Sequence, residues 1–168
     1  QADVVIMSIH WGLRHIPKTI CTYQPPVAHA AIDAGADLIL GHHAHSIKAI
    51  EVYKGKVCFY SIGNFMTTGS RKIHNVPEWN LYWREQDLES AYNFPPHCRP
   101  TMIPKITVTK SGVARVAILP AYINKLAQPE VLQQGTPLFD AVLRELEWVS
   151  DYMPHSFEVH GDEVVVGA

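Results

Sequence analysis

Residues 3–9 read DVVIMSI and residues 36–40 read ADLIL, and these two stretches decide the fold. Both are short, apolar runs rich in β-branched residues, the pattern of a strand buried on both faces. Between them Pro25-Pro26 opens a helix and Gly35 ends it, because proline suits the first helical turn and glycine the C-terminal cap. Strand, helix and strand predict a parallel, right-handed βαβ unit.

The rest of the chain continues a mixed α/β pattern. Apolar residues at i, i+3, i+4 and i+7 predict that the first helix buries the face formed by Val27, Ala30, Ala31 and Ala34. Residues 66 to about 100 have no sustained period and predict a long loop over one face. The other expected elements are hairpins over 46–53 with 56–62 and over 102–109 with 113–119, a helix from Pro137 to about Asp151 capped by Thr136, and a strand over 163–166.

The composition is that of one folded domain of ordinary size. Of the 168 residues, 47% are hydrophobic and 18% charged, so the chain can bury a core and is not disordered. The formal net charge is −2 and there is no long charged run, so we predict no nucleic-acid partner and no anionic membrane surface as partner. Cys21, Cys58 and Cys98 form no CxxC motif, which predicts free thiols.

The residues themselves leave the localisation unknown. No apolar run reaches the roughly 18 residues of a membrane helix, and no basic start followed by an apolar core marks a signal peptide. The sequence opens at Gln1 and enters a strand almost at once, so we expect a piece of a longer protein, with any anchor or targeting signal upstream.

Histidine is the one compositional excess, and the run GHHAH over residues 41–45 follows the second strand. In an extended segment residues i and i+2 share a face, so His43 and His45 are predicted to point the same way and His42 the opposite way. His10 follows the first strand, and the carboxyl ends of parallel strands meet at one edge. We therefore predict that His10, His43 and His45 bind one metal ion or two neighbouring ones, the alternative being satisfied polar groups in surface loops.

Several neighbours of these histidines are candidates for substrate contact or for support of the ligands. His42 and Gly41 are two of these candidates, and Gly41 lets the backbone turn sharply where the strand ends. Trp11 and Gly12 either shape a metal pocket, with Trp11 stacking on substrate, or belong to the core. Asn64 is placed to bond a ligand or a metal-bound histidine. Glu51 either supports the ligands or is a solvated strand residue. The loop after His10 contains Arg14, His15 and Lys18. These residues either hold an anion or are ordinary solvated loop residues, and we favour the solvated loop.

Residues 3–65 resemble the bacterial capsule-synthesis proteins of the CapA (poly-γ-glutamate synthesis) type, which are related to the calcineurin-like metallophosphoesterases. Five blocks in order carry the resemblance, and such an ordered set is highly specific. They are His10-Trp11-Gly12, the run IDAGAD over 32–37, the run GHHAH over 41–45, Ile50-Glu51 and the run YSIGNF over 60–65.

The resemblance implies an α/β fold that is the C-terminal half of a metallophosphatase-like αββα sandwich with mixed β-sheets. We expect one truncated domain over residues 1–168, with its core motifs in 3–65, a loop-rich insertion over 66–100, and a hairpin and helix over 101–168. The complete domain would hold two divalent metal ions (Mn, Fe or Zn), with His10 and His43 on one ion and His45 on the other. A small-molecule or polymer substrate such as polyglutamate, membrane synthase partners and a place in the cell envelope are also implied.

This chain departs from the family pattern in one main respect. The DxH, GDxxD and GNH-type motifs of the family's first half do not occur in it, and Gly63-Asn64-Phe65 belongs to a later hairpin. Many relatives have an acidic residue where this chain has Arg14. Three neutral imidazoles do not offset the charge of two divalent cations, so bridging carboxylates are needed. We therefore expect weak or single-site metal binding in this chain alone, little activity, and an exposed sheet edge.

Three functions are consistent with these residues. The first is a metal-dependent hydrolase of the phosphoesterase type, in which metal-activated water attacks the substrate. The second is a non-catalytic component that binds or exports polymer in polyglutamate synthesis. The third is a plain α/β domain without metal. The sequence does not define the substrate.

Overall fold

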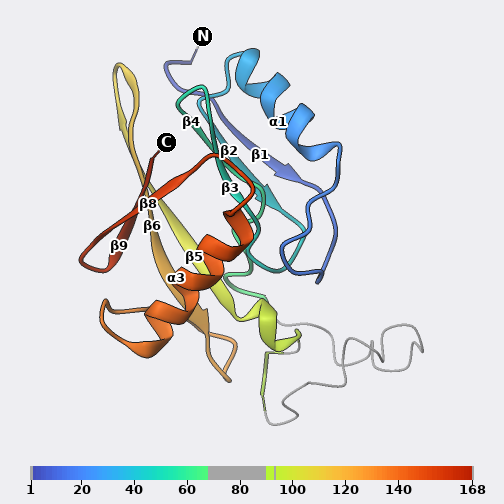
Figure 1. Cartoon of the computed structure of the whole chain (residues 1–168), viewed down its shortest axis with the longest axis vertical. Coiled ribbons are helices and arrows are strands. Elements are labelled where there is room, and N and C mark those ends of the chain that lie inside the picture. The colour runs from blue at the N-terminus through green and yellow to red at the C-terminus, as the bar shows by residue number, and fades with distance from the viewer. Residues whose placement is uncertain (1, 68–89, 93, 168) are drawn as a thin grey trace.

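The computed structural model describes residues 2–67, 90–92 and 94–167, and Figure 1 shows two β-sheets with helices beside them. The expected insertion over 66–100 lies largely outside the described residues. The first sheet has the strand order β1-β2-β4-β3. Its members are β1 (Ile6–His10), β2 (Leu38–His42) and β4 (Lys56–Phe59), which run parallel, and β3 (Ile50–Tyr53), which is antiparallel to β4.

The predicted βαβ unit and first hairpin are confirmed. Helix α1 (Gln24–Asp33) joins β1 to β2, and these strands pair in parallel with Ile6 beside Leu38 and His10 beside His42. Strand β1 ends one residue later than the sequence predicted, and β2 ends two residues later. Both therefore deliver histidines to the same edge of the sheet, because their carboxyl ends lie side by side.

The second sheet is antiparallel and follows the first in sequence. Strands β5 (Pro100–Thr109), β6 (Gly112–Ile123), β9 (Glu163–Gly167) and β8 (Ser156–His160) pair in that order, and β7 (Pro129–Val131) pairs with β6. A 3₁₀ turn, η3 (Pro96–Cys98), precedes β5. The second hairpin and the last strand are confirmed. Strands β7 and β8 were not predicted, because β7 is very short and β8 has only two apolar residues.

Helix α3 (Pro137–Ser150) begins at Thr136, whose hydroxyl oxygen accepts a hydrogen bond from the Phe139 amide at 3.3 Å, as the sequence predicted. Figure 1 shows α3 beside β5 and β3, and it contacts β3, β5 and β6. The Ser150 hydroxyl oxygen accepts a hydrogen bond from the Ile50 amide at 3.0 Å. Helix α3 therefore links the edge strand of the first sheet to the second sheet.

One core cluster joins both sheets to α3. Burial of each large apolar side chain contributes about 1.5–3 kcal/mol, so this shared cluster holds the two sheets together. The expected mixed α/β fold with two sheets is confirmed. Members of the cluster include Leu38, Ile50 and Phe59 from the first sheet, Met102, Ile118 and Val164 from the second, and Phe139, Val142 and Leu146 from α3.

Helix α1 covers the other face of the first sheet, and its predicted buried face is wrong. The buried residues of α1 are Gln24, Ala28 and Ile32, whereas Val27 is 39% exposed. The side-chain oxygen of Gln24 accepts a hydrogen bond from the Cys21 amide at 2.7 Å, which fixes the start of the helix. Alanine occurs around most of this helix, so its sequence pattern alone does not select a face.

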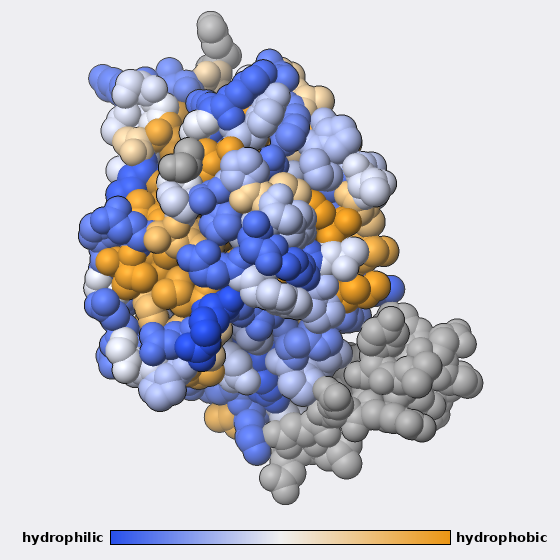
Figure 2. Space-filling view, viewed as in Figure 1, coloured by the Kyte–Doolittle hydropathy of each residue, from blue (hydrophilic) through white to orange (hydrophobic). Residues whose placement is uncertain are grey.

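The expected exposed sheet edge is present at β1, which forms one end of the first sheet. Val5 and Ile6 at this edge are 45% and 44% exposed. Figure 2 shows further apolar side chains gathered on the side of the molecule where β6, β8 and β9 lie. No helix among the described residues has the length and apolar character to cross a membrane.

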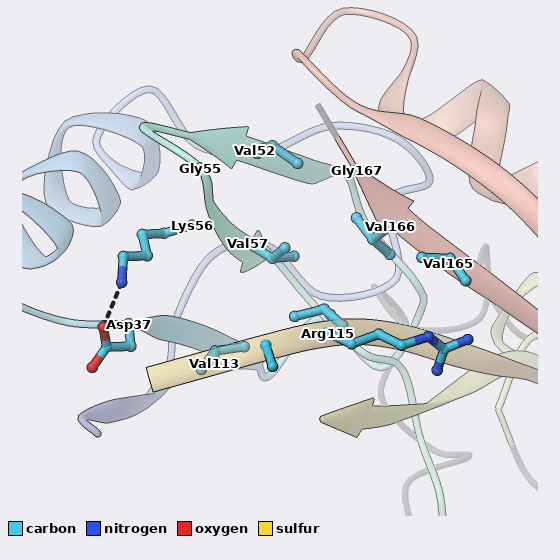
Figure 3. A pocket seen from close by; sticks show the side chains of 12 residues that line it. Asp37, Val52, Gly55, Lys56, Val57, Val113, Arg115, Val165, Val166 and Gly167 are labelled. Atoms are coloured by element: carbon cyan, nitrogen blue, oxygen red, sulfur yellow. Dashed lines mark hydrogen bonds and ion pairs between the residues drawn. The ribbon is translucent and has the colours of Figure 1, made fainter. Parts of the chain in front are cut away.

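A cavity of about 280 Å³ opens between the two sheets (Figure 3). Asp37 and Lys56 form an ion pair of 2.5 Å at its rim. Asp37 directly precedes β2, and Lys56 is the first residue of β4. The cavity thus lies at the amino ends of β2 and β4, whereas His10 and His43 lie at the carboxyl ends of β1 and β2. Its apolar lining includes Val52, Val57, Val113, Val116, Val165 and Val166.

Candidate metal centre

The two strands of the βαβ unit bring His10 and His43 into direct contact. His10 is the last residue of β1, and His43 follows β2. The Nε2 atom of His10 lies 2.6 Å from Nδ1 of His43, and the ring centroids are 4.4 Å apart at an interplanar angle of 66°. The Trp11 amide donates a hydrogen bond to the His42 carbonyl oxygen at 3.2 Å, which holds the two chain segments together.

The local geometry of GHHAH differs from the extended segment that the sequence predicted. His43 and His45 have φ of 91° and 59°, so the chain leaves the strand in a tight, irregular turn. His42 is still in β2 beside His10, and its Nε2 lies 3.1 Å from the Ser8 hydroxyl oxygen. Neighbouring residues of parallel strands share a sheet face, so His42 lies on the same face of the sheet as His10.

His45 is held apart from the His10–His43 pair by its own contacts. Its ring stacks on His15 at 5.2 Å and 11°, and its Nδ1 lies 2.7 Å from Oδ1 of Asn64. Because an amide oxygen only accepts, His45 Nδ1 donates this bond and Nε2 keeps its lone pair. Burial lowers the pKa of His45, the Asn64 hydrogen bond opposes that shift, and the positive charge of Arg14 adds to it.

The donor set fits metal binding in part. Burial lowers the pKa of His43, as do the nearby His10 and Arg14, and a neutral ring is the form that binds a metal ion. Two nitrogens at about 2.1 Å from a tetrahedral ion lie about 3.4 Å apart, so His10 and His43 would have to separate by a small side-chain rotation. In the described part of the chain, no group of three or more His, Cys, Asp or Glu side chains is arranged to hold an ion.

The Asn64 amide completes the surroundings of His45. Its nitrogen donates to the Tyr92 hydroxyl oxygen at 2.7 Å and to the His45 carbonyl oxygen at 3.3 Å. Asn64 is buried, and the hydroxyl oxygen of Ser46, directly after His45, is also buried and has no hydrogen-bond partner among the described residues. A buried polar atom of this kind marks a place for a ligand or a water.

Trp11 and Gly12 take structural positions in this chain. Trp11 is 5% exposed, stacks on Tyr60 at 5.6 Å and donates from Nε1 to the Tyr60 carbonyl oxygen at 2.9 Å. Of the two alternatives for Trp11, a residue that stacks on substrate or a residue of the core, the structure therefore supports the core residue. Gly12 has φ of 87° and lies against the side-chain amide of Gln24, so it shapes the loop after β1. Gly41 lies between these aromatic residues and β4, too close for any side chain.

Glu51 is a buried residue on β3 and not a solvated strand residue. Its exposure is 4%, and its carboxyl oxygens lie 2.6 Å from the Tyr60 hydroxyl and 2.8 Å from His29 Nε2. The His29 ring stacks on Tyr53 at 3.8 Å. Glu51 thus supports the site indirectly, because it fixes Tyr60, on which Trp11 stacks.

His15 is the main residue that the sequence did not predict for this cluster. It is 7% exposed, and burial, with the neighbouring His45 and Arg14, lowers its pKa to about 4. Its Nδ1 lies 3.6 Å from Cys98 Sγ, and His97 Nε2 donates to its carbonyl oxygen at 2.9 Å. Its closeness to His10 in sequence was the only signal, because loops carry no period from which burial can be predicted.

Lys48 is a second buried group that the sequence did not single out. It is 2% exposed, and its ammonium donates to the Ile16 carbonyl oxygen. Burial lowers its pKa from 10.5 to about 8, an effect that Cys98 and Cys21 oppose. The three cysteines are free, as predicted.

We expect Lys48 to make stability depend on pH in the alkaline range. The folded protein disfavours the charged ammonium, so the contribution of Lys48 to stability is full above pH 10.5 and is lost as pH falls through 8. The unfolding free energy of the wild type minus that of Lys48→Met should fall by about 3 kcal/mol over this window. Urea unfolding of both proteins at several pH values measures it. A flat difference would contradict the prediction, and Lys110→Met, in an exposed turn, controls for removal of a lysine.

The fold and the histidine cluster define a mixed α/β protein with two sheets and a candidate metal site at the carboxyl ends of parallel strands. Residues 1–68 match the family described as "Bacterial capsule synthesis protein PGA_cap". Over these residues the chain is similar to CapA-type capsule synthesis proteins, the family that its sequence motifs resemble. The match ends before the second sheet and α3.

Curated relatives align over the same segment. The chain is 48% identical over 66 residues to the PGA biosynthesis protein CapA of Bacillus subtilis (strain 168), which covers 39% of this chain and 17% of that protein. It is 45% identical over 66 residues to the capsule biosynthesis protein CapA of Bacillus anthracis, with 39% and 16% covered. A probable polyglutamine synthesis accessory protein of Mycobacterium tuberculosis is 39% identical over 62 residues, with 37% and 16% covered. The matched segment thus spans about a sixth of the length of these relatives.

Proposed function

We propose that this chain is part of a protein of bacterial capsule or poly-γ-glutamate synthesis, and that His10, His43 and His45 bind divalent metal ions in it. The observation that carries the proposal is the contact between His10 and His43 at the carboxyl ends of β1 and β2. The names of the relatives support the process, and their place in capsule synthesis supports action at the cell envelope.

The proposed chemistry is metal-dependent hydrolysis of the phosphoesterase type on a small-molecule or polymer substrate such as polyglutamate. A metal ion held by these imidazoles would supply Lewis acidity and an activated water. The chain itself contributes neutral nitrogen donors, and Asn64 fixes the His45 ring so that its Nε2 keeps the lone pair. Carboxylates that balance the charge of two cations would have to come from outside the described residues.

Metal content tests the proposal directly. Purified chain is incubated with Mn²⁺, Fe²⁺ or Zn²⁺, desalted and measured by mass spectrometry, and His43→Ala is expected to lose the bound ion because one of two touching donors is gone. His160→Ala, an exposed histidine on β8 beside Glu158, is the matched control. Equal metal content in the wild type and in His43→Ala would overturn the assignment of His43.

Asn64 provides a second test through His45. Asn64→Leu removes the acceptor of His45 Nδ1 and the donor to Tyr92, so we expect unfolding free energy to fall by about 1–3 kcal/mol. Metal affinity should fall about 10–100-fold, the usual effect of removing such a supporting bond. Asn64→Asp keeps an acceptor for His45 and should retain most of the affinity. Titration calorimetry that finds wild-type affinity in Asn64→Leu would exclude His45 as a ligand.

A non-catalytic role in polymer binding or export is the second candidate. It is favoured because no group of three or more His, Cys, Asp or Glu side chains in the described part of the chain is arranged to hold a metal ion. Polymer production in cells and release of a phenol from an aryl phosphate with added Mn²⁺ separate the two candidates. Loss of polymer in His43→Ala without any metal-dependent phosphoesterase activity supports the binding role, whereas loss of both supports the hydrolase.

A further inference from the structure

The loop after β1 folds back onto the histidine cluster. The amide of His15 donates to the Ala44 carbonyl oxygen at 2.9 Å, and the His15 ring stacks on His45. His97 holds the carbonyl oxygen of His15 from the other side. These contacts fix the backbone of residue 14 beside residues 43–45, and the Arg14 side chain at this point is exposed.

The charge of Arg14 reaches the candidate ligands. Burial is the largest cause of the lowered pKa of His43, His45 and His15. The positive charge of the Arg14 guanidinium also lowers the pKa of each of these three histidines, together with contributions from other groups. Guanidinium is charged at every physiological pH, and the imidazoles beside it are neutral. The surroundings of the cluster therefore carry a fixed positive charge.

We propose that Arg14 binds an oxyanion group of the substrate, a carboxylate or a phosphate, at the histidine cluster. This inference rests on the proposed function of that cluster. The planar guanidinium offers paired N–H donors that match two oxygens of either anion, which a single ammonium does not. Arg14 thereby sets the specificity of the site for anionic substrates.

The positive charge of Arg14 is also expected to weaken the binding of metal ions, whereas it strengthens the binding of anions. A fixed cation beside the nitrogen donors repels a divalent metal ion, since like charges in a partly buried site interact strongly. Removal of the guanidinium should weaken the binding of anions and strengthen the binding of metal ions. A variant that merely loosens the loop would weaken both.

Lys18 supplies a matched control on the same loop. Its ammonium lies 2.6 Å from Asp151 and over the rings of Trp148 and Tyr152 on α3 and the turn that follows it. Lys18→Gln removes the same charge from the same segment. Its ammonium is directed to α3 and not to the histidines, so the affinity for anions should stay at the wild-type value.

The experiment measures two affinities in the whole chain. Inorganic phosphate and acetate are titrated separately without metal, with the histidine ring signals followed by NMR, and Zn²⁺ is titrated by calorimetry without added oxyanion. Arg14→Gln should bind the preferred anion about 10-fold more weakly and Zn²⁺ several-fold more tightly. Arg14→Lys should keep the wild-type affinity for Zn²⁺ and lose part of the anion affinity.

The outcomes of this experiment distinguish the anion site at Arg14 from the metal site at the histidines. Unchanged anion affinity in Arg14→Gln, or an equal loss in Lys18→Gln, overturns the role of Arg14. Weaker binding of both phosphate and Zn²⁺ in Arg14→Gln also overturns it, since this indicates a disturbed loop. If no metal binds to any variant but Arg14→Gln loses anion binding, the metal proposal fails and the anion site stands. The anion with the larger loss identifies the group that Arg14 prefers.

Discussion

Replacement of Gly41 with alanine is expected to prevent stable folding of the first sheet. An added Cβ would lie 2.3 Å from the Tyr60 carbonyl oxygen, 2.6 Å from the Phe59 carbonyl oxygen and 2.6 Å from Trp11 Nε1. Two of these atoms belong to the backbone and cannot rotate away. Overpacking by one methyl commonly costs about 1–3 kcal/mol where side chains can adjust.

Here the backbone of β2 itself would have to move away from the segment that follows β4. That movement would weaken the hydrogen bond of 3.1 Å that the Ile62 amide donates to the Gly41 carbonyl oxygen, and it would displace His42 and His43. We expect the unfolding free energy to fall by more than about 4 kcal/mol, a large part of the stability of an ordinary domain.

Urea unfolding followed by circular dichroism measures the effect of Gly41→Ala. Gly161→Ala is the control, because Gly161 has φ of 62° and no atom within 4 Å of an added Cβ. That variant should lose only the roughly 1–2 kcal/mol of a left-handed alanine. Equal losses in the two variants would show that Gly41 is not under steric constraint.

Removal of the Glu51 side chain is the second change with a large expected effect. Burial raises the pKa of the Tyr60 hydroxyl, as does its hydrogen bond to Glu51, so Tyr60 stays protonated and donates to the Glu51 carboxyl group. Glu51→Ala leaves this buried donor and His29 Nε2 without their partner. Leaving a buried donor without its partner costs about 1–3 kcal/mol, and the cavity left by the removed side chain adds to this loss.

Conservative replacement distinguishes this mechanism from loss of volume. Glu51→Gln keeps an oxygen acceptor for Tyr60 and should lose less than half as much stability in thermal and urea unfolding. Glu158→Ala removes a carboxyl group that is 76% exposed beside His160, and should change the unfolding free energy by less than about 1 kcal/mol. A loss in Glu51→Gln as large as in Glu51→Ala would show that the Tyr60 hydrogen bond is not what stabilises this region.

The sequence alone determined the elements whose patterns are local. The apolar runs before His10 and before His42 predicted two parallel strands, and the crossover between them predicted that His10 and His43 lie at one edge. Thr136 and the apolar spacing after it predicted α3 almost to the residue. These features depend on caps and on periods within a few residues, which a sequence records directly.

The tertiary structure decided the features that depend on distant contacts. It buried Gln24 and Ile32 on α1 in place of the predicted alanine-rich face, because the contact surface on the sheet selects the helix face. It placed Glu51 against Tyr60 and His29, and it brought His15 onto His45. Side chains in irregular turns have directions set by their packing partners and not by a repeating period. The position of residue 14 beside the histidine cluster, which follows from the contacts of His15 with Ala44 and His45, was therefore established only by the folded chain.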